Sequence, residues 1–233
     1  MAAKTAGLCS PPSSTRRPDW LTPRAGTECS MVDANNPLQV GIVVFPEVEE
    51  LDFVGPWEVF TMAAKVGAPV NTFTVAWPEK TLRCAKGLRI EADYDFSDAP
   101  HADLVIVPGG QGTRTIIMDD AFINALRDYL AAAKWQASVC TGAALLGQTG
   151  FLDGKRATTN HVAMDWVRSM ARKAYFTTDE RYVRHGTVVT SGGVSAGIDM
   201  SLWFVGHLFG HDTAHETQRV MEYYPEPPYG TSR

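Results

Sequence analysis

The chain has 233 residues and a formal net charge of −5 at pH 7, with 45% hydrophobic and 20% charged residues. This composition is ordinary for a globular protein, and the length allows one α/β domain with an extension, or at most two small domains. An acidic chain without a basic stripe outside its N-terminal tail gives no reason to expect nucleic-acid binding, and no apolar run approaches the roughly 20 residues that a membrane span needs.

Residues 1–37 differ from the rest because they are rich in proline and serine and poor in aliphatic residues. We predict a disordered N-terminal extension here, followed by one α/β domain over residues 38–233. Arg16, Arg17 and Arg24 leave an organelle transit peptide open, and a true start at Met31 is an equal alternative. The four cysteines form no Cys-x-x-Cys pair, which fits a reducing compartment, and we expect a cytoplasmic protein.

Residues 38–45 form a β-branched run that predicts a strand buried in a parallel sheet. Pro46 ends it, and a helix is expected to begin around Pro56. Asp52 then falls in the loop at the C-terminal end of the strand, the edge where open α/β sheets bind ligands. It could hold and return a proton or merely cap the helix, and its neighbours are expected to form a solvated face: Glu49, Glu50 and Glu58.

Further strands are predicted at 70–77 and 104–107, with a hairpin pairing 81–84 and 88–92. The strand at 104–107 ends in Pro108-Gly109-Gly110, whose N–H groups are expected to face the same edge as Asp52. Residues 121–133 form a clear helix, with Asp119 or Asp120 available as its N-cap.

Residues 136–147 are typical of a nucleophile elbow, in which a short strand stops at Cys140 and turns directly into a helix. The helix N–H groups beside the sulfur would lower the thiol pKa toward neutrality. Cys140 could equally be a small buried hydrophobe. With a reactive cysteine, Gly109, Gly110 and the N–H of Thr141 become a candidate oxyanion hole.

Beyond the elbow, strands are predicted at 156–159, 175–178 and 187–191, and helices at 164–171 and 194–209. Gly210 ends the last of these, and Asp212 is expected to cap a final helix that runs to about 223. Alternating strands and helices predict an α/β fold, a flavodoxin-like doubly wound sandwich with a mainly parallel central sheet. Three histidines spaced by four would suit a metal, but Gly210 interrupts their helix, so we expect no metal site at His207, His211 and His215.

Five blocks of the sequence, taken together and in this order, resemble the ThiJ/PfpI superfamily, and most of all its isocyanide hydratase branch. They are Leu51-Asp52-Phe53-Val54-Gly55-Pro56, Val107-Pro108-Gly109-Gly110, Ser138-Val139-Cys140-Thr141-Gly142, Arg156-Ala157-Thr158-Thr159 and Gly192-Gly193-Val194-Ser195-Ala196-Gly197. The resemblance implies a homodimer without metal or organic cofactor, acting on a small molecule. It implies Cys140 as nucleophile, Asp52 as its acid/base partner, and Thr141 with the Gly110 region as groups that hold the reacting atoms.

The resemblance further implies hydration of an isocyanide to an N-substituted formamide through a thioimidate on Cys140. Two alternatives remain open, a redox-responsive protein in which Cys140 is oxidised to a sulfinate, and a glyoxalase or deglycase type of enzyme. Many relatives read Thr-Thr-His where this chain has Thr158-Thr159-Asn160-His161, which weakens any histidine-assisted activity. Similar blocks begin some transcription regulators, but no helix-turn-helix module follows here before Arg233, and we do not expect that role.

Overall fold

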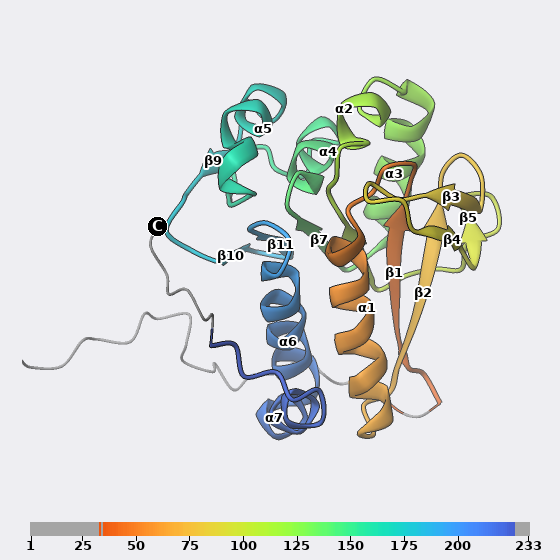
Figure 1. Ribbon diagram of the computed structural model, residues 1–233, viewed down its shortest axis with the longest axis vertical. Helices are drawn as coiled ribbons and strands as arrows, with labels where there is room; N and C mark the ends of the chain where they lie inside the picture. Colours follow the sequence, from red (N-terminus) through yellow and green to blue (C-terminus); the bar gives the residue numbers. More distant parts are fainter. Residues whose placement is uncertain (1–32, 34, 227–233) are drawn as a thin grey trace, which may run out of the picture. The chain divides into compact units, whose positions relative to one another are not determined.

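The computed structural model describes residue 33 and residues 35–226, all within the unit Met31–Arg233 (Figure 1). The prediction for residues 1–37 lies almost entirely outside this part of the chain. The strands are β1 Leu38–Val44, β2 Val70–Ala76, β3 Thr81–Arg83, β4 Arg89–Glu91, β5 Tyr94–Asp95, β6 Leu104–Val107, β7 Trp135–Val139, β8 Arg156–Ala157, β9 Tyr175–Phe176, β10 Tyr182–His185 and β11 Val188–Ser191. The helices are α1 Glu50–Lys65, α2 Thr113–Ile116, α3 Asp120–Ala132, α4 Gly142–Gln148, the 3-10 turn η2 His161–Ala163, α5 Met164–Met170, α6 Ala196–Phe209 and α7 His211–Val220.

Seven strands form the central sheet in the order β10-β11-β7-β6-β1-β2-β5. Every neighbouring pair is parallel except β10 and β11, which run antiparallel. The predicted α/β fold with a mainly parallel central sheet is therefore confirmed. The predicted hairpin is also present, as the separate antiparallel pair β3 and β4.

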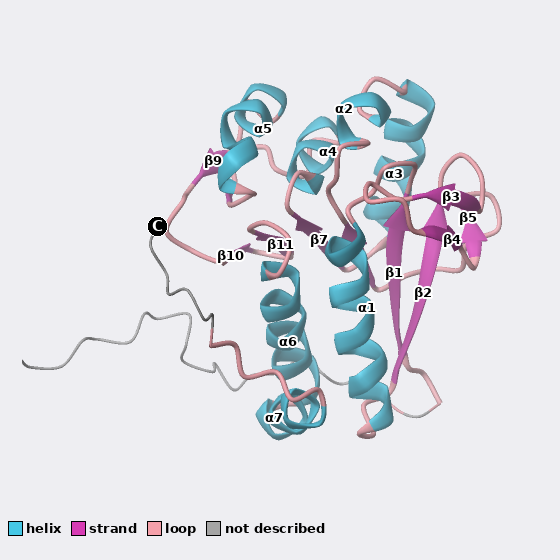
Figure 2. Cartoon of the chain, viewed as in Figure 1, coloured by secondary structure: helices cyan, strands magenta, loops and turns pink. Residues whose placement is uncertain are grey.

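Helices cover both faces of this sheet, which explains why its central strands are so apolar. Every residue of β6, β7 and β11 is buried, and β1 is buried at all positions but one. A strand that is buried on both faces needs aliphatic side chains at consecutive positions rather than alternating ones. Figure 2 shows α1, α6 and α7 packed together, with α2, α4 and α5 gathered near the carboxyl ends of the strands.

The first helix begins earlier than the sequence predicts. It starts at Glu50, so Asp52 lies in its first turn rather than in a loop, and Pro56 lies inside the helix. Pro56 removes the N–H that would have bonded the carbonyl four residues earlier, at Asp52. The acidic residues near Asp52 were expected to precede the helix, but they also suit its first turn, because a helix N-terminus favours negative charge.

Two other predictions about helix ends are corrected in part. Asp119 does cap α3, since its side chain accepts the N–H groups of Ala121 and Phe122. Asp212 does not cap α7, because that helix already begins at His211 and makes no side-chain cap. Glycine at 210 has a positive φ of 96°, which both ends α6 and starts α7.

Candidate active site

The predicted nucleophile elbow is present where β7 ends and α4 begins. Cys140 has a φ of 55°, a conformation that is uncommon for a side-chain-bearing residue and is found at functional turns. Its own N–H donates to the carbonyls of Ser191 and Gly192, at 3.3 and 3.1 Å. Its carbonyl accepts the Thr159 hydroxyl at 2.6 Å. These contacts fix the backbone of Cys140 on both sides, so the direction of its thiol is set by the fold.

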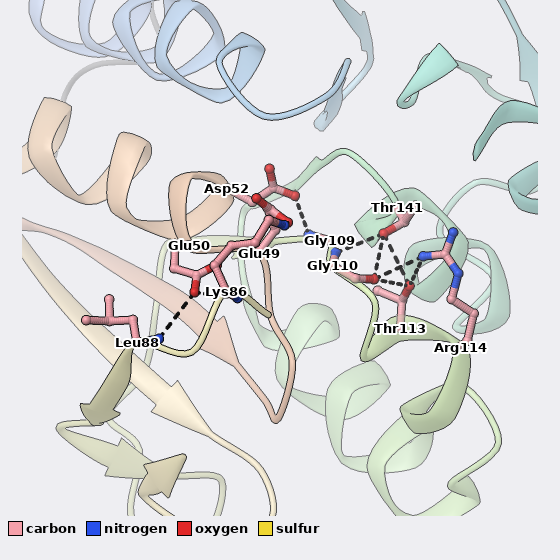
Figure 3. Close-up of polar contacts among 10 residues, drawn as sticks. All are labelled: Glu49, Glu50, Asp52, Lys86, Leu88, Gly109, Gly110, Thr113, Arg114 and Thr141. Carbon is pink, nitrogen blue, oxygen red and sulfur yellow. Dashed lines mark hydrogen bonds and ion pairs between the residues drawn. The ribbon is translucent and has the colours of Figure 1, made fainter. Parts of the chain in front are cut away.

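Asp52 is fully buried at the N-terminal end of α1 and faces Cys140. Its Oδ2 accepts the Gly109 N–H at 2.9 Å (Figure 3), while Oδ1 has no hydrogen-bond partner at normal bonding distance among the described residues. Burial raises the pKa of Asp52 to about 7, and the negative charge of Glu49 adds to this. The Gly109 N–H, the Cys140 thiol and the Val194 N–H lower the pKa, but burial outweighs them. A carboxyl group in this state can gain or lose a proton near neutral pH.

The pKa of Cys140 differs from the sequence expectation. The thiol is 6% exposed, and burial raises its pKa to about 12, with the nearby Asp52 charge as the second cause. The Asn160 amide and the N–H groups of Thr141 and Val194 act in the opposite direction, but they are weaker than burial. The predicted lowering toward neutrality is therefore wrong, because the sulfur is shielded from water and lies near the charge of Asp52. The thiol and the carboxyl group together hold at least one proton at neutral pH.

The N–H groups of both glycines in the expected oxyanion hole already have hydrogen-bond partners. The Gly109 N–H is used by Asp52, and the Gly110 N–H donates to Thr141 Oγ1 at 3.0 Å. A Cβ at Gly109 would lie 2.6 Å from Thr141 N and 2.8 Å from Asp52 Oδ2. Glycine is thus required for the close approach of these groups. Of the three predicted donors, the Thr141 N–H is the one that faces the sulfur.

A hydrogen-bonded network extends from Gly110 and Thr141 to a residue that the sequence reasoning missed. Thr113 Oγ1 donates to the Gly110 carbonyl at 2.8 Å and lies 3.2 Å from Thr141 Oγ1. The half-buried Arg114 donates to the same carbonyl and to Thr113 Oγ1 (Figure 3). Its guanidinium also lies over the ring of Trp166, 4.3 Å from the centroid. Nothing in the sequence around Arg114 marks it, because its packing against the distant Trp166 appears only in the folded chain.

Val194 and Asn160 are the other contributors that sequence analysis did not assign to the site. Val194 lies before α6 with a φ of 47°, and its N–H faces both Asp52 and Cys140. The expected helix over 194–209 begins at Ala196 instead, because this strained turn precedes it. The double glycine before Val194 was the available signal. For Asn160 the signal was its departure from the family pattern.

The acidic neighbours of Asp52 do not form the solvated face that was expected. Glu49 pairs with Lys86 at 2.6 Å and is only 20% exposed. Glu50 Oε1 accepts the Lys86 N–H at 2.7 Å, so both carboxylates hold the loop between β3 and β4 against the start of α1. Glu58, further along the helix, is exposed as predicted.

Among residues 35–226, no group of three or more His, Cys, Asp or Glu side chains is arranged to hold a metal ion. In the same part of the chain, no helix is both long and apolar enough to cross a bilayer.

The fold and this site define a class of protein, an α/β sandwich with a cysteine on a nucleophile elbow and a buried carboxyl group facing it. Comparison with known proteins agrees with that description. The model of the DJ-1/PfpI family matches residues 38–206, and the chain belongs to this family.

Three similar proteins show how far the similarity extends. Isonitrile hydratase of Pseudomonas putida is 35% identical over 193 residues, which is 82% of this chain and 81% of that protein. The crystal structure of a ThiJ/PfpI family protein from Pseudomonas syringae superposes with a TM-score of 0.76 at 28% identity, over 90% of this chain and 85% of that one. Drosophila melanogaster DJ-1beta, with a TM-score of 0.69 at 19% identity over 81% of this chain and all of that one, shares the fold.

Proposed function

We propose that this chain hydrates a small isocyanide to an N-substituted formamide, with Cys140 as nucleophile and Asp52 as general acid and base. The similarity to a protein named isonitrile hydratase supports the reaction class. The observation that carries the chemistry is the buried carboxyl group of Asp52, whose pKa of about 7 and unpartnered Oδ1 suit it to exchange a proton beside Cys140.

The first half of the reaction adds the thiol across the terminal carbon of the isocyanide. The thiol proton passes to Asp52, and the thiolate attacks that carbon, forming a C–S bond. Asp52 then gives the proton to the same carbon, which yields a thioimidate, R–N=CH–S-Cys140. The elements of S–H have been added to one carbon, and Asp52 is again a carboxylate.

The second half consumes one water. The oxygen of the water attacks the thioimidate carbon while Asp52 takes one of its protons and passes it to the nitrogen. The C–S bond then breaks as the hydroxyl proton of the adduct moves to the sulfur of Cys140, and the formamide R–NH–CHO leaves. The N–H of Thr141 lies where it can stabilise the sulfur in both halves, while Gly109 and Gly110 hold Asp52 and Thr141 in position.

The redox-responsive alternative has less support. Sensor cysteines combine a low pKa with exposure, whereas Cys140 is buried and its pKa is raised. The buried Cys84, with a pKa raised to about 11, is no harder to ionise. The glyoxalase or deglycase alternative would use the same thiol, and turnover of methylglyoxal would reveal it.

The test is formamide production from a simple alkyl isocyanide, followed by mass spectrometry. Wild type and a Cys84→Ala control should form product, and Cys140→Ala should form none because covalent catalysis has no substitute for the nucleophile. Asp52→Asn should be slower by at least about 10²-fold, the usual contribution of an acid/base group. No formamide from wild type, or equal formamide from Cys140→Ala, would contradict the proposal.

A further inference from the structure

The segment before α5 is held directly against the elbow. The Thr158 N–H donates to Thr190 Oγ1 at 2.8 Å, and the Thr159 hydroxyl donates to the Cys140 carbonyl at 2.6 Å. Asn160 follows at once and begins the η2 turn. Two consecutive anchors therefore fix the backbone of Asn160 relative to the sulfur of Cys140.

The orientation of the Asn160 amide is also determined. Its Oδ1 accepts the Val162 N–H at 2.9 Å, a contact that the NH₂ end could not make. The NH₂ group is therefore left to face the site, where it favours the ionised form of the Cys140 thiol. A Cβ at Gly193 would lie 2.4 Å from Asn160 Nδ2, so the glycine leaves the room that the amide occupies.

We propose that Asn160 is a further catalytic residue, whose amide N–H donates to the Cys140 sulfur and stabilises the thiolate formed during the reaction. The inference rests on the proposed function in taking Cys140 as the nucleophile. Burial and the charge of Asp52 both oppose a thiolate here, so a donor aimed at the sulfur has a direct effect on reactivity. Of the groups that favour the thiolate, Asn160 is the side chain, and the others are backbone N–H groups of Thr141 and Val194.

The chemical identity of this donor matters for the proton. A histidine in this place would add a second group that titrates near pH 7. An amide donates at every pH and takes no proton, so proton transfer is left to Asp52. The site then works with one acid/base group and one fixed donor on the nucleophile.

Two substitutions distinguish the two roles of the Asn160 side chain, as a hydrogen-bond donor to the sulfur and as the cap of the η2 turn. Asn160→Ser and Asn160→Asp both keep an oxygen that can accept the Val162 N–H, and both remove the NH₂ donor. The test measures how the rate of Cys140 alkylation by iodoacetamide depends on pH. Peptide mass spectrometry follows Cys140 and Cys84 separately, and Cys84 serves as the internal reference. His161→Gln, at the exposed next residue, is the matched control.

If Asn160 stabilises the thiolate, Asn160→Ser should be alkylated about ten-fold more slowly near pH 8, the size expected for a hydrogen bond to a charged group. Asn160→Asp should be slower still, because it places a negative charge beside the sulfur. Gly193→Ala should reproduce the Asn160→Ser result by displacing the amide. Thermal midpoints should stay near that of wild type, and His161→Gln should react at the wild-type rate.

Wild-type rates in both Asn160 variants would overturn the inference and leave Asn160 as a cap. The alkylation readout does not depend on the substrate. Absence of formamide with the expected alkylation pattern would therefore reject the hydratase proposal and leave the role of Asn160 intact.

Discussion

A carboxyl group in water loses its proton near pH 4, but burial keeps the proton on Asp52 up to about pH 7. The groups that face it include the Cys140 thiol, the carboxylate of Glu49 and, through its ion pair with Glu49, Lys86. The reactive form of the site has one proton shared between Asp52 and Cys140. At low pH the pair holds two protons, and the thiolate cannot form.

We therefore expect kcat/KM to rise with pH through about 7 and then level off, and Glu49→Gln to move this rise to lower pH. The reason is that Glu49 is negative and raises the pKa of Asp52, so its removal lets Asp52 ionise earlier. The pH profile of isocyanide hydration gives the measurement. Glu58→Gln, an exposed change on the same helix, should leave the profile in place. An unchanged pH profile in Glu49→Gln would show that Glu49 does not raise the pKa of Asp52.

The sequence could indicate Cys140 and Asp52 because each follows a predicted strand, and the carboxyl ends of parallel strands meet at one edge. It could not indicate Arg114 or the N–H of Val194, whose places depend on how separate loops pack. Nor could it give the pKa of Cys140, because the loss of water around the sulfur arises only when every neighbouring segment is in position.

At the scale of elements, the elbow depends on α4 approaching the end of β6 very closely. A Cβ at Gly142 would lie 2.1 Å from the Val107 carbonyl oxygen. The strand and helix were predicted with nearly correct bounds, because an apolar strand, a glycine turn and a run of helix formers follow one another. The start of α1 was missed, because acidic residues suit both a loop and the first turn of a helix.

Gly142→Ala should lower the free energy of unfolding by about 1–3 kcal/mol or more, since backbone rather than a flexible side chain blocks the new methyl group. Gly206→Ala, in α6, is the matched control, because its Cβ would lie 3.4 Å from the Ala214 side chain in α7. The control should be neutral or stabilising by up to about 1 kcal/mol, from better helix propensity. Urea denaturation measures both. If Gly142→Ala is as stable as wild type, the backbone of the elbow can shift to make room for the new methyl group.

For the whole molecule, the site has a cost in stability that depends on pH. Asp52 has a pKa of 3.8 when unfolded and about 7 when folded, so the folded state binds the proton more tightly. The stabilisation from this proton is complete below about pH 4 and is lost as pH rises through 7.

The sheet order that creates this buried position could not be predicted from the sequence, because β5 and β10 are short edge strands with weak sequence patterns.

Asp52→Asn, which imitates the protonated acid at all pH values, should therefore be more stable than wild type at pH 8. The difference should approach about 4 kcal/mol, from 1.36 kcal/mol per unit of pKa, and should vanish near pH 4. Thermal or chemical unfolding at both pH values measures it. The same variant should lose activity, so stability and function oppose each other at this residue. If Asp52→Asn is no more stable than wild type at pH 8, folding does not raise the pKa of Asp52.

The expected homodimer is a prediction at the same scale. Leu51 and Val54 are each 38% exposed on one side of α1, and the 48% exposed Leu88 lies beside them, with its N–H on Glu50 Oε1. If a second copy covers this face, sedimentation should give a dimer for wild type and a monomer for Val54→Glu. Val220→Glu, at the 41% exposed Val220 on α7, should remain dimeric. A dimer that survives Val54→Glu would place the interface elsewhere.

The loop after β6 limits how this protein could be redesigned. New side chains at Gly109, Gly110 or Gly112 would meet neighbouring atoms at 2.6, 2.4 and 1.9 Å, in each case backbone. Combinatorial libraries that vary these three glycines would consist mostly of chains that do not fold. Substitutions are better tolerated at Arg114 and Trp166, which contact each other through side chains rather than main chain.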